Sequence, residues 1–159
     1  MKKIIYCIFI LIFCRDFCLA EDTDRSLEIT ANTMEWDKAA EKAIAIGNAV
    51  ATQGDKTIEA DRIIANLNKK SSNKEISSLK AEGSVIFYRT GEKITSKEAL
   101  YDLEKDVITL KGDVNFQKED NIMFGEQLII NFKTGVSQLI GGNEKKKVKM
   151  KYNNKKKED

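Results

Sequence analysis

The sequence predicts an all-β protein that is built from repeated strand units. A segment that opens with isoleucine occurs four times, and these openings are Ile29, Ile58, Ile94 and Ile122. Each is followed by a strand that opens with glycine, and these glycines are Gly47, Gly83, Gly112 and, in degraded form, Gly141. A repeat of about 30 residues made of short apolar strands buries its hydrophobic faces only by stacking on its neighbours. The repeat therefore predicts a β stack that offers a long surface or trough.

Composition supports alternating strands and turns. Three runs, 85–88, 107–110 and 128–132, are rich in the β-branched and aromatic residues that favour strands. Turn-forming residues occur at 53–55, 90–92, 111–113 and 133–135. Gly47-Asn48 and Gly112-Asp113 recur at one position of the repeat, which predicts a fixed backbone corner that needs a permissive φ. No helix-opening sequence follows these glycines, so they are not expected to form a phosphate-binding loop.

Two segments carry helix-like signals that the repeat overrules. Residues 96–105 are amphipathic with a capping serine, and residues 37–45 are rich in alanine. The equivalent stretches of other repeats, 60–67 and 125–132, contain pairs of isoleucines, which favour strands. Because tertiary context commonly overrides helix propensity, we expect strands in all four stretches.

Alternation along the strands predicts an inner, apolar face. Successive side chains of a strand point to opposite sides, so residues two apart share a face. With each opening isoleucine placed inside, the inner face contains Leu27, Ile29, Ala31, Ala49, Ala51, Ile58, Ala60, Val85, Phe87, Ile94, Ser96, Val114, Phe116, Ile122 and Phe124. Met34, Trp36, Tyr101 and Leu103 join it only if a bulge or corner near Asn32 and Lys97 changes the alternation. A closed sandwich core explains the same pattern, so alternation alone leaves open whether this face binds a ligand.

The first 20 residues resemble a cleaved export signal. Lys2 and Lys3 precede an apolar run at 4–13, and small residues precede a cleavage point after Ala20. Ten apolar residues are too few to span a bilayer, but a retained membrane anchor is the alternative. Cleavage removes all three cysteines, Cys7, Cys14 and Cys18, and leaves a chain without disulfides. The expected organisation is a signal peptide at 1–20, one domain at 21–142 and a tail at 143–159.

The tail differs in charge from the domain. Residues 143–159 contain eight lysines against three acidic residues, so the rest of the mature chain is acidic. The tail is low in complexity and is expected to be disordered, either as a solubilising segment or as a tether to anionic lipid or phosphate. Nucleic acid is not an expected partner, because the chain carries an export signal and its domain is acidic.

The composition argues against an enzyme. The chain has no histidine, and the mature chain has no cysteine, which excludes histidine-assisted nucleophilic catalysis and the usual zinc sites. Acidic residues lie mostly at turns and outward strand positions, where solvation explains them. We therefore expect no catalytic residues, no metal and no cofactor.

Order and spacing of several motifs identify a family resemblance. These are ITANTMEWD at 29–37, the GNAVATQG run at 47–54, IEADRI at 58–63, GSVIFY at 83–88 and YDLEKD at 101–106, followed by the lysine-rich end. The chain resembles the OstA-like family over residues 22–142. The resemblance implies a half-open, twisted antiparallel β-jelly roll in the periplasm that carries lipopolysaccharide from the inner to the outer membrane, with acyl chains between two sheets.

The resemblance also implies site residues and partners. Lipid-facing positions of the family correspond here to Thr23, Leu27, Ile29, Phe87, Tyr101 and Leu103. Implied partners are lipopolysaccharide through its lipid A acyl chains, LptC-like and LptD-like domains in the inner and outer membranes, and further copies of the chain arranged head to tail. Two alternatives are an inner-membrane-anchored LptC-like component of the same pathway and a structural β-repeat protein that polymerises without a ligand.

Overall fold

The computed structural model describes residues 26–68, 75–142 and 146–152, and these form one antiparallel sheet of ten strands. The predicted signal peptide and Thr23 lie outside the described residues. The sheet order is β1-β3-β4-β5-β6-β7-β8-β10, with β2 paired to β3 and β9 paired to β8. The strands are β1 Leu27–Thr30, β2 Thr33–Asp37, β3 Lys42–Gln53, β4 Lys56–Leu67, β5 Ile76–Arg89, β6 Glu92–Asp102, β7 Val107–Lys118, β8 Asn121–Asn131, β9 Ser137–Ile140 and β10 Lys149–Lys151.

A row of β-bulges bends the long strands, as the recurring glycines predict. In β3, Gly47 and Asn48 together face the single residue Asp61 of β4, so the register shifts between Ile46 and Ala49. Both bulge residues have positive φ, 77° for Gly47 and 46° for Asn48. Equivalent pairs in β5 and β7 adopt the same conformation (Gly83-Ser84 and Gly112-Asp113). Because two residues oppose one at each bulge, the strand bends and its alternation changes parity there.

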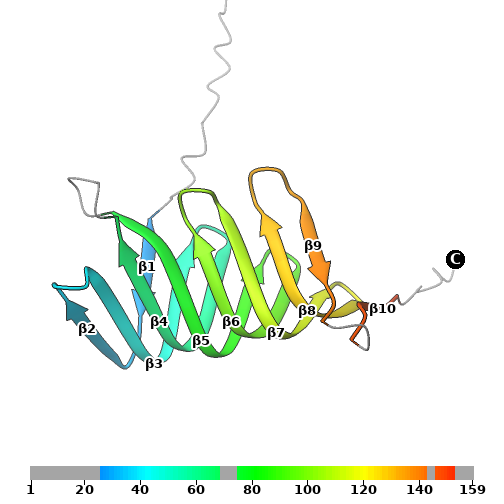
Figure 1. Cartoon of the computed structure of the whole chain (residues 1–159), viewed down its shortest axis with the longest axis horizontal. Helices are drawn as coiled ribbons and strands as arrows, with labels where there is room; N and C mark the ends of the chain where they lie inside the picture. The colour runs from blue at the N-terminus through cyan, green and yellow to red at the C-terminus, as the bar shows by residue number, and fades with distance from the viewer. Residues whose placement is uncertain (1–25, 69–74, 143–145, 153–159) are drawn as a thin grey trace, which may run out of the picture.

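The bends fold the single sheet into two layers. Each of the strands β3 to β8 contributes one half to each layer, and Figure 1 shows these strands curving around one edge of the stack. The first layer holds the halves that pair outward to β2 at one end and β9 at the other. The second layer holds the halves that pair outward to β1 and β10. The sheet is therefore open along the seam opposite the bend, which agrees with the predicted half-open fold.

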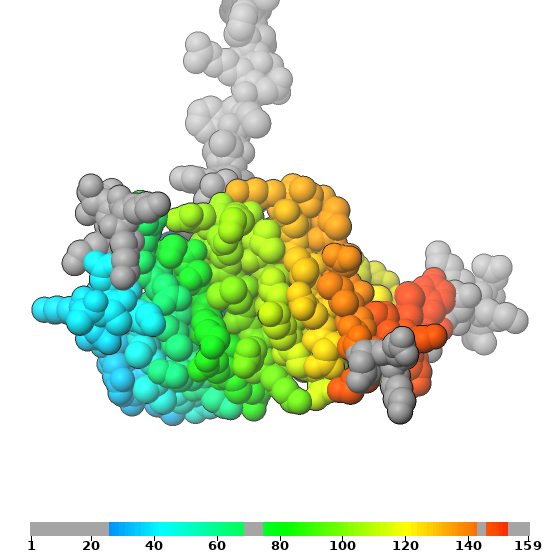
Figure 2. Space-filling view, in the orientation of Figure 1, coloured from blue at the N-terminus to red at the C-terminus, as the bar shows by residue number. Residues whose placement is uncertain are grey.

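The hydrophobic core lies between the layers. Inward side chains of the second layer, such as Val85 and Phe87, are as fully buried as Ile108 and Leu128 of the first layer. Colours run in sequence order along the long axis of Figure 2, because each of the strands from β3 to β8 pairs with the next one in the chain. The helix-like segments contain no helix, and they are strands at residues 42–45 of β3 and 96–102 of β6, as the repeat predicts. Residues 38–41 and 103–105, also expected to be strands, form turns instead. Among the described residues, no helix is long and apolar enough to cross a membrane.

The carboxy-terminal tail is partly ordered, which corrects one expectation. Strand β10 lies inside the segment predicted to be disordered, and its Met150 is the register partner of Met123 in β8. Unpaired backbone at the edge of β8 offers hydrogen bonds to any extended segment, whatever its composition. The expectation of disorder therefore fails for residues 149–151.

Candidate functional site between the two layers

Most of the inward residues predicted from alternation do lie in the interior. Those that are buried are Ile58, Val85, Phe87, Ile94, Tyr101, Val114 and Phe116. Leu27, Ile29 and Leu103 are partly buried and pack against this core. The alanines of the first repeat, Ala49 and Ala51, are buried as well, as the alternation predicts.

The prediction that Ile122 and Phe124 point inward is wrong. Met123, which lies between them, is the register partner of the buried Phe116 and packs against the core. Ile122 and Phe124 instead pair with Gln117 and Asn115 on the opposite face. Met123 lies eleven residues after Gly112, the spacing that also separates Ile58 from Gly47, so a uniform count from the glycines identifies the inward residue.

The sequence-based site omits much of the first layer. Ile63, Leu79, Ile108, Leu110, Leu128 and Ile130 are buried in the interior and make up its apolar lining in that layer. They follow or precede the bulges, where alternation restarts with opposite parity. A regular spacing identifies these inward positions in the sequence. Ile63 lies five residues after the inward residue Ile58, and Met34, Ala99 and Leu128 each lie five residues after the inward residue of their own repeat.

Each end of the stack leaves part of one layer uncovered. Met34 and Trp36 of β2 lie opposite Ala45 and Ala43, on the inner side of the first layer, yet they are 52% and 57% exposed. At the other end Met150 of β10 lies beside Met123 on the inner side of the second layer and is 57% exposed. Figure 1 shows β2 projecting beyond β1 at one end, and β10 projecting beyond β9 at the other. The uncovered apolar faces therefore belong to different layers at the two ends.

Polar contacts join the layers across the open seam. The Tyr101 hydroxyl donates to Asp106 Oδ1 at 2.6 Å and lies 3.0 Å from the side-chain oxygen of Gln53. Lys56 Nζ lies 3.7 Å from Asp106 Oδ1. Tyr101 and Asp106 belong to the first layer, whereas Gln53 ends β3 and Lys56 begins β4 in the second layer. Burial, and then the neighbouring Asp106 carboxylate, raise the pKa of the Tyr101 phenol, so it remains a neutral donor.

Phe132 fills the same part of the seam. Its ring centroid is 6.0 Å from that of Phe87 in the second layer and 5.8 Å from that of Tyr101 in the first, with an edge-on arrangement to Tyr101. Lys56 Nζ and Arg89 Cζ lie 4.8 Å and 5.3 Å from the same centroid. These distances suit aromatic and cation–π attraction, so Phe132 holds the two layers together at this point.

Charge inside the site is confined to its rim. Glu92 is buried at the turn between β5 and β6, where Arg89 and Lys118 approach its carboxylate at 2.6 Å and 3.0 Å. Ser96 is the other buried polar residue among those described, and its hydroxyl donates to the Glu98 carbonyl. Among the described residues, the interior is thus apolar and without fixed charge, which suits hydrocarbon. In the described part of the chain, no group of acidic side chains is placed to hold a metal ion.

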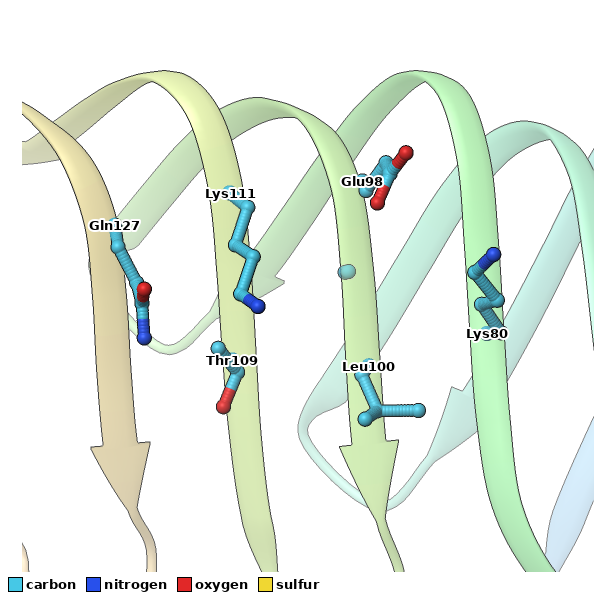
Figure 3. Close-up of a pocket in the computed structure, with 7 residues that line it drawn as sticks. Lys80, Glu98, Leu100, Thr109, Lys111 and Gln127 are labelled. Atoms are coloured by element: carbon cyan, nitrogen blue, oxygen red, sulfur yellow. The ribbon is translucent and has the colours of Figure 1, made fainter.

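A depression on the first layer lies outside this site. It has a volume of about 390 Å³ and is lined by Lys80, Glu98, Ala99, Leu100, Thr109, Lys111 and Gln127. Figure 3 shows the labelled side chains standing on one face of neighbouring strands. That face is the outer one, because Leu100 and Lys111 alternate with the buried Tyr101 and Leu110. The depression is separated from the apolar interior by the sheet itself.

The fold and the site define the class of this protein as an all-β protein whose single antiparallel sheet folds around a half-open, uncharged apolar interior. The family model described as LptA/(LptD N-terminal domain) LPS transport protein matches residues 28–136. The chain belongs to this family, which is the family that the sequence motifs indicate.

Solved structures show the same fold. One is the crystal structure of LptH from Pseudomonas aeruginosa, described as the LptA homologous periplasmic component of the conserved lipopolysaccharide transport device. The TM-score is 0.72, and the alignment covers 83% of this chain and 99% of LptH at 14% sequence identity. No curated protein matches this chain in sequence.

Proposed function

We propose that this protein binds lipopolysaccharide by its acyl chains and carries it through the periplasm, as a soluble bridge between the inner and outer membranes. The observation that carries this proposal is the uncharged apolar interior between the two layers. The bent strands connect the layers along one side, whereas only side-chain contacts connect them along the other. The likeness to LptH and the export-like first 20 residues support the periplasmic location. Retention of that segment would instead make the protein an anchored, LptC-like component.

The energetics suit a carrier. Burial of an acyl chain contributes roughly 0.8 kcal/mol per methylene, so one long chain contributes on the order of 10 kcal/mol. An apolar lining provides this free energy without fixing the chain at one place, because the hydrophobic effect has no preferred direction. Lipid can therefore be held out of water and still slide along the trough.

Photo-crosslinking tests where the lipid lies. A photoreactive amino acid at Phe87 or Tyr101 should capture lipopolysaccharide in Gram-negative cells, because both side chains are buried between the layers. The same amino acid at Leu100 is the control, since Leu100 is the neighbour of Tyr101 on the outer face and is 49% exposed. Capture is measured as lipopolysaccharide-modified protein on immunoblots. Equal capture at the inner and outer positions would rule out the interior as the binding site.

We further propose that copies of the chain join head to tail and that the same ends meet LptC-like and LptD-like domains in the two membranes. The uncovered inner faces support this, because the first layer projects at one end and the second layer at the other, so the two ends are complementary in shape. Charge also differs between the ends, with Glu35 and Asp37 on β2 and Lys149 and Lys151 on β10. Such a heterologous contact does not close on itself and gives chains of variable length.

Light scattering tests this assembly. Trp36→Glu places a charge on the uncovered apolar face of β2 and is expected to abolish concentration-dependent growth, because that face can no longer be buried against another copy. Leu100→Glu makes the same kind of change on an exposed apolar residue away from the ends and should leave growth unchanged. Growth that is insensitive to Trp36→Glu, or a strict monomer for the unmodified chain, would contradict the proposed joint.

A further inference from the structure

We propose that Lys56 and Arg89 form a binding site for the anionic head group of an amphiphile whose acyl chains lie between the layers. In this inference, which rests on the proposed function, the head group replaces Asp106 as the partner of Lys56. The site would therefore select phosphorylated or otherwise acidic lipids over neutral lipids with the same acyl chains.

Two cations meet over one aromatic ring at the mouth of the interior. Lys56 Nζ and Arg89 Cζ lie 4.8 Å and 5.3 Å from the centroid of Phe132. Their side chains are only 20% and 23% exposed, so both cations are mostly withdrawn from water. A charge in such a place needs a counter-ion, because its hydration has been lost.

The counter-ions of the two cations lie on different layers. Arg89 pairs with Glu92 at 2.6 Å, and both residues belong to the second layer, so this pair stays intact when the layers part. Lys56 is also in the second layer, but its partner Asp106 is in the first and is 3.7 Å away. Asp55, next to Lys56 in the chain, accepts a hydrogen bond from Thr90 at 3.4 Å. Separation of the layers therefore removes the Asp106 carboxylate from Lys56 and leaves Arg89 paired.

Entry of acyl chains requires that separation. Buried apolar side chains lie between the layers, and Phe132, Tyr101 and Asp106 close the seam at the point where Lys56 and Arg89 lie. When hydrocarbon enters there, the head group of the same molecule remains at the rim. An anionic head group then restores the charge balance of Lys56, whereas a neutral one leaves a half-buried cation without a partner.

Binding of lipid A tests the site. The probes are diphosphorylated lipid A and its fully dephosphorylated form, each in competition with fluorescent lipid A in the same detergent. Lys56→Gln and Arg89→Gln should each weaken binding of the phosphorylated probe about tenfold, as expected for loss of one charge-assisted contact, and should change binding of the dephosphorylated probe little. Lys111→Gln is the matched control, because it removes one positive charge from the outer face.

A second variant separates recognition from a general effect on folding. Asp106→Asn removes the competing carboxylate and leaves both cations in place, so it should strengthen binding of the phosphorylated probe. If Asp106→Asn and Lys56→Gln changed the affinity for both probes in the same direction, the two residues would have a structural role, and the proposal would be overturned. A wild-type protein that binds both probes equally, or a preference that survives in both cation variants, would overturn it too and leave the proposed function standing. Binding of neither probe to wild type would count against the proposed function itself.

Discussion

Replacement of Gly83 by alanine is expected to lower the free energy of unfolding by about 3 kcal/mol, as measured by urea denaturation. The residue lies in the bulge of β5 with φ of +77°, where an L side chain costs about 1–2 kcal/mol. A methyl group there would also overlap the carboxylate of Asp61, and overpacking of this kind costs about 1–3 kcal/mol. The bulge sets the bend that makes two layers from one sheet, so the loss should reduce lipid binding as well.

Gly91→Ala provides the matched control for this prediction. Gly91 has φ of +73°, but nothing lies within 4 Å of the position that its Cβ would take. Its replacement should therefore cost only the conformational part, about 1 kcal/mol after the gain from a less flexible unfolded chain. Asp61→Gly in the Gly83→Ala background should restore part of the stability. Equal losses for Gly83→Ala and Gly91→Ala would mean that the close approach to Asp61 is unimportant.

The repeat predicts the strands and the corner because both depend on local sequence. Glycine followed by a small polar residue at a fixed position indicates a left-handed pair, and the structure has such pairs at Gly47, Gly83 and Gly112. Side-chain alternation then predicts most of the inner face correctly. It fails at Ile122 and Phe124 because a shift of one residue in register exchanges the two faces of a strand.

The contacts across the seam could not be predicted in this way. Tyr101 and Gln53 are 48 residues apart in the chain, and no periodicity links them. Their meeting depends on how far one layer is displaced relative to the other, which follows from packing of the whole core. The sequence also does not predict the short strand β10, because its three residues, two of them lysines, have the composition of a solvated tail.

A covalent link across the seam is expected to abolish lipid binding. Lys56 and Asp106 lie on different layers, and their charged atoms are 3.7 Å apart. Both residues would be changed to cysteine in a chain that begins at Glu21 and so has no other cysteine. A short, reducible reagent that joins the two thiols would hold the layers together. Because Tyr101 and Phe132 close the seam at this point, lipid reaches the buried apolar residues there only when the layers part. Binding should return when the link is reduced, to the level of the double-cysteine protein that was never linked, which lacks Lys56 and so binds more weakly than the unmodified chain.

A second linked pair controls for the chemistry of the reagent. Arg62 and Glu82 are register partners on neighbouring strands of the first layer, and their charged atoms lie 3.3 Å apart on the outer face. Cysteines at these two positions, joined by the same reagent, link strands within one layer and leave the seam free. This variant should bind lipid as well as the unmodified protein does.

Native mass spectrometry of the seam-linked protein, incubated with lipopolysaccharide, tests most directly whether lipid enters between the layers. The predicted spectrum shows lipid-bound mass for the unmodified protein, for the Arg62–Glu82 link and for the reduced Lys56–Asp106 pair, and no lipid-bound mass for the Lys56–Asp106 link before reduction. Lipid bound to the seam-linked protein at the level of the unmodified protein would contradict the account, because acyl chains would then lie outside the interior.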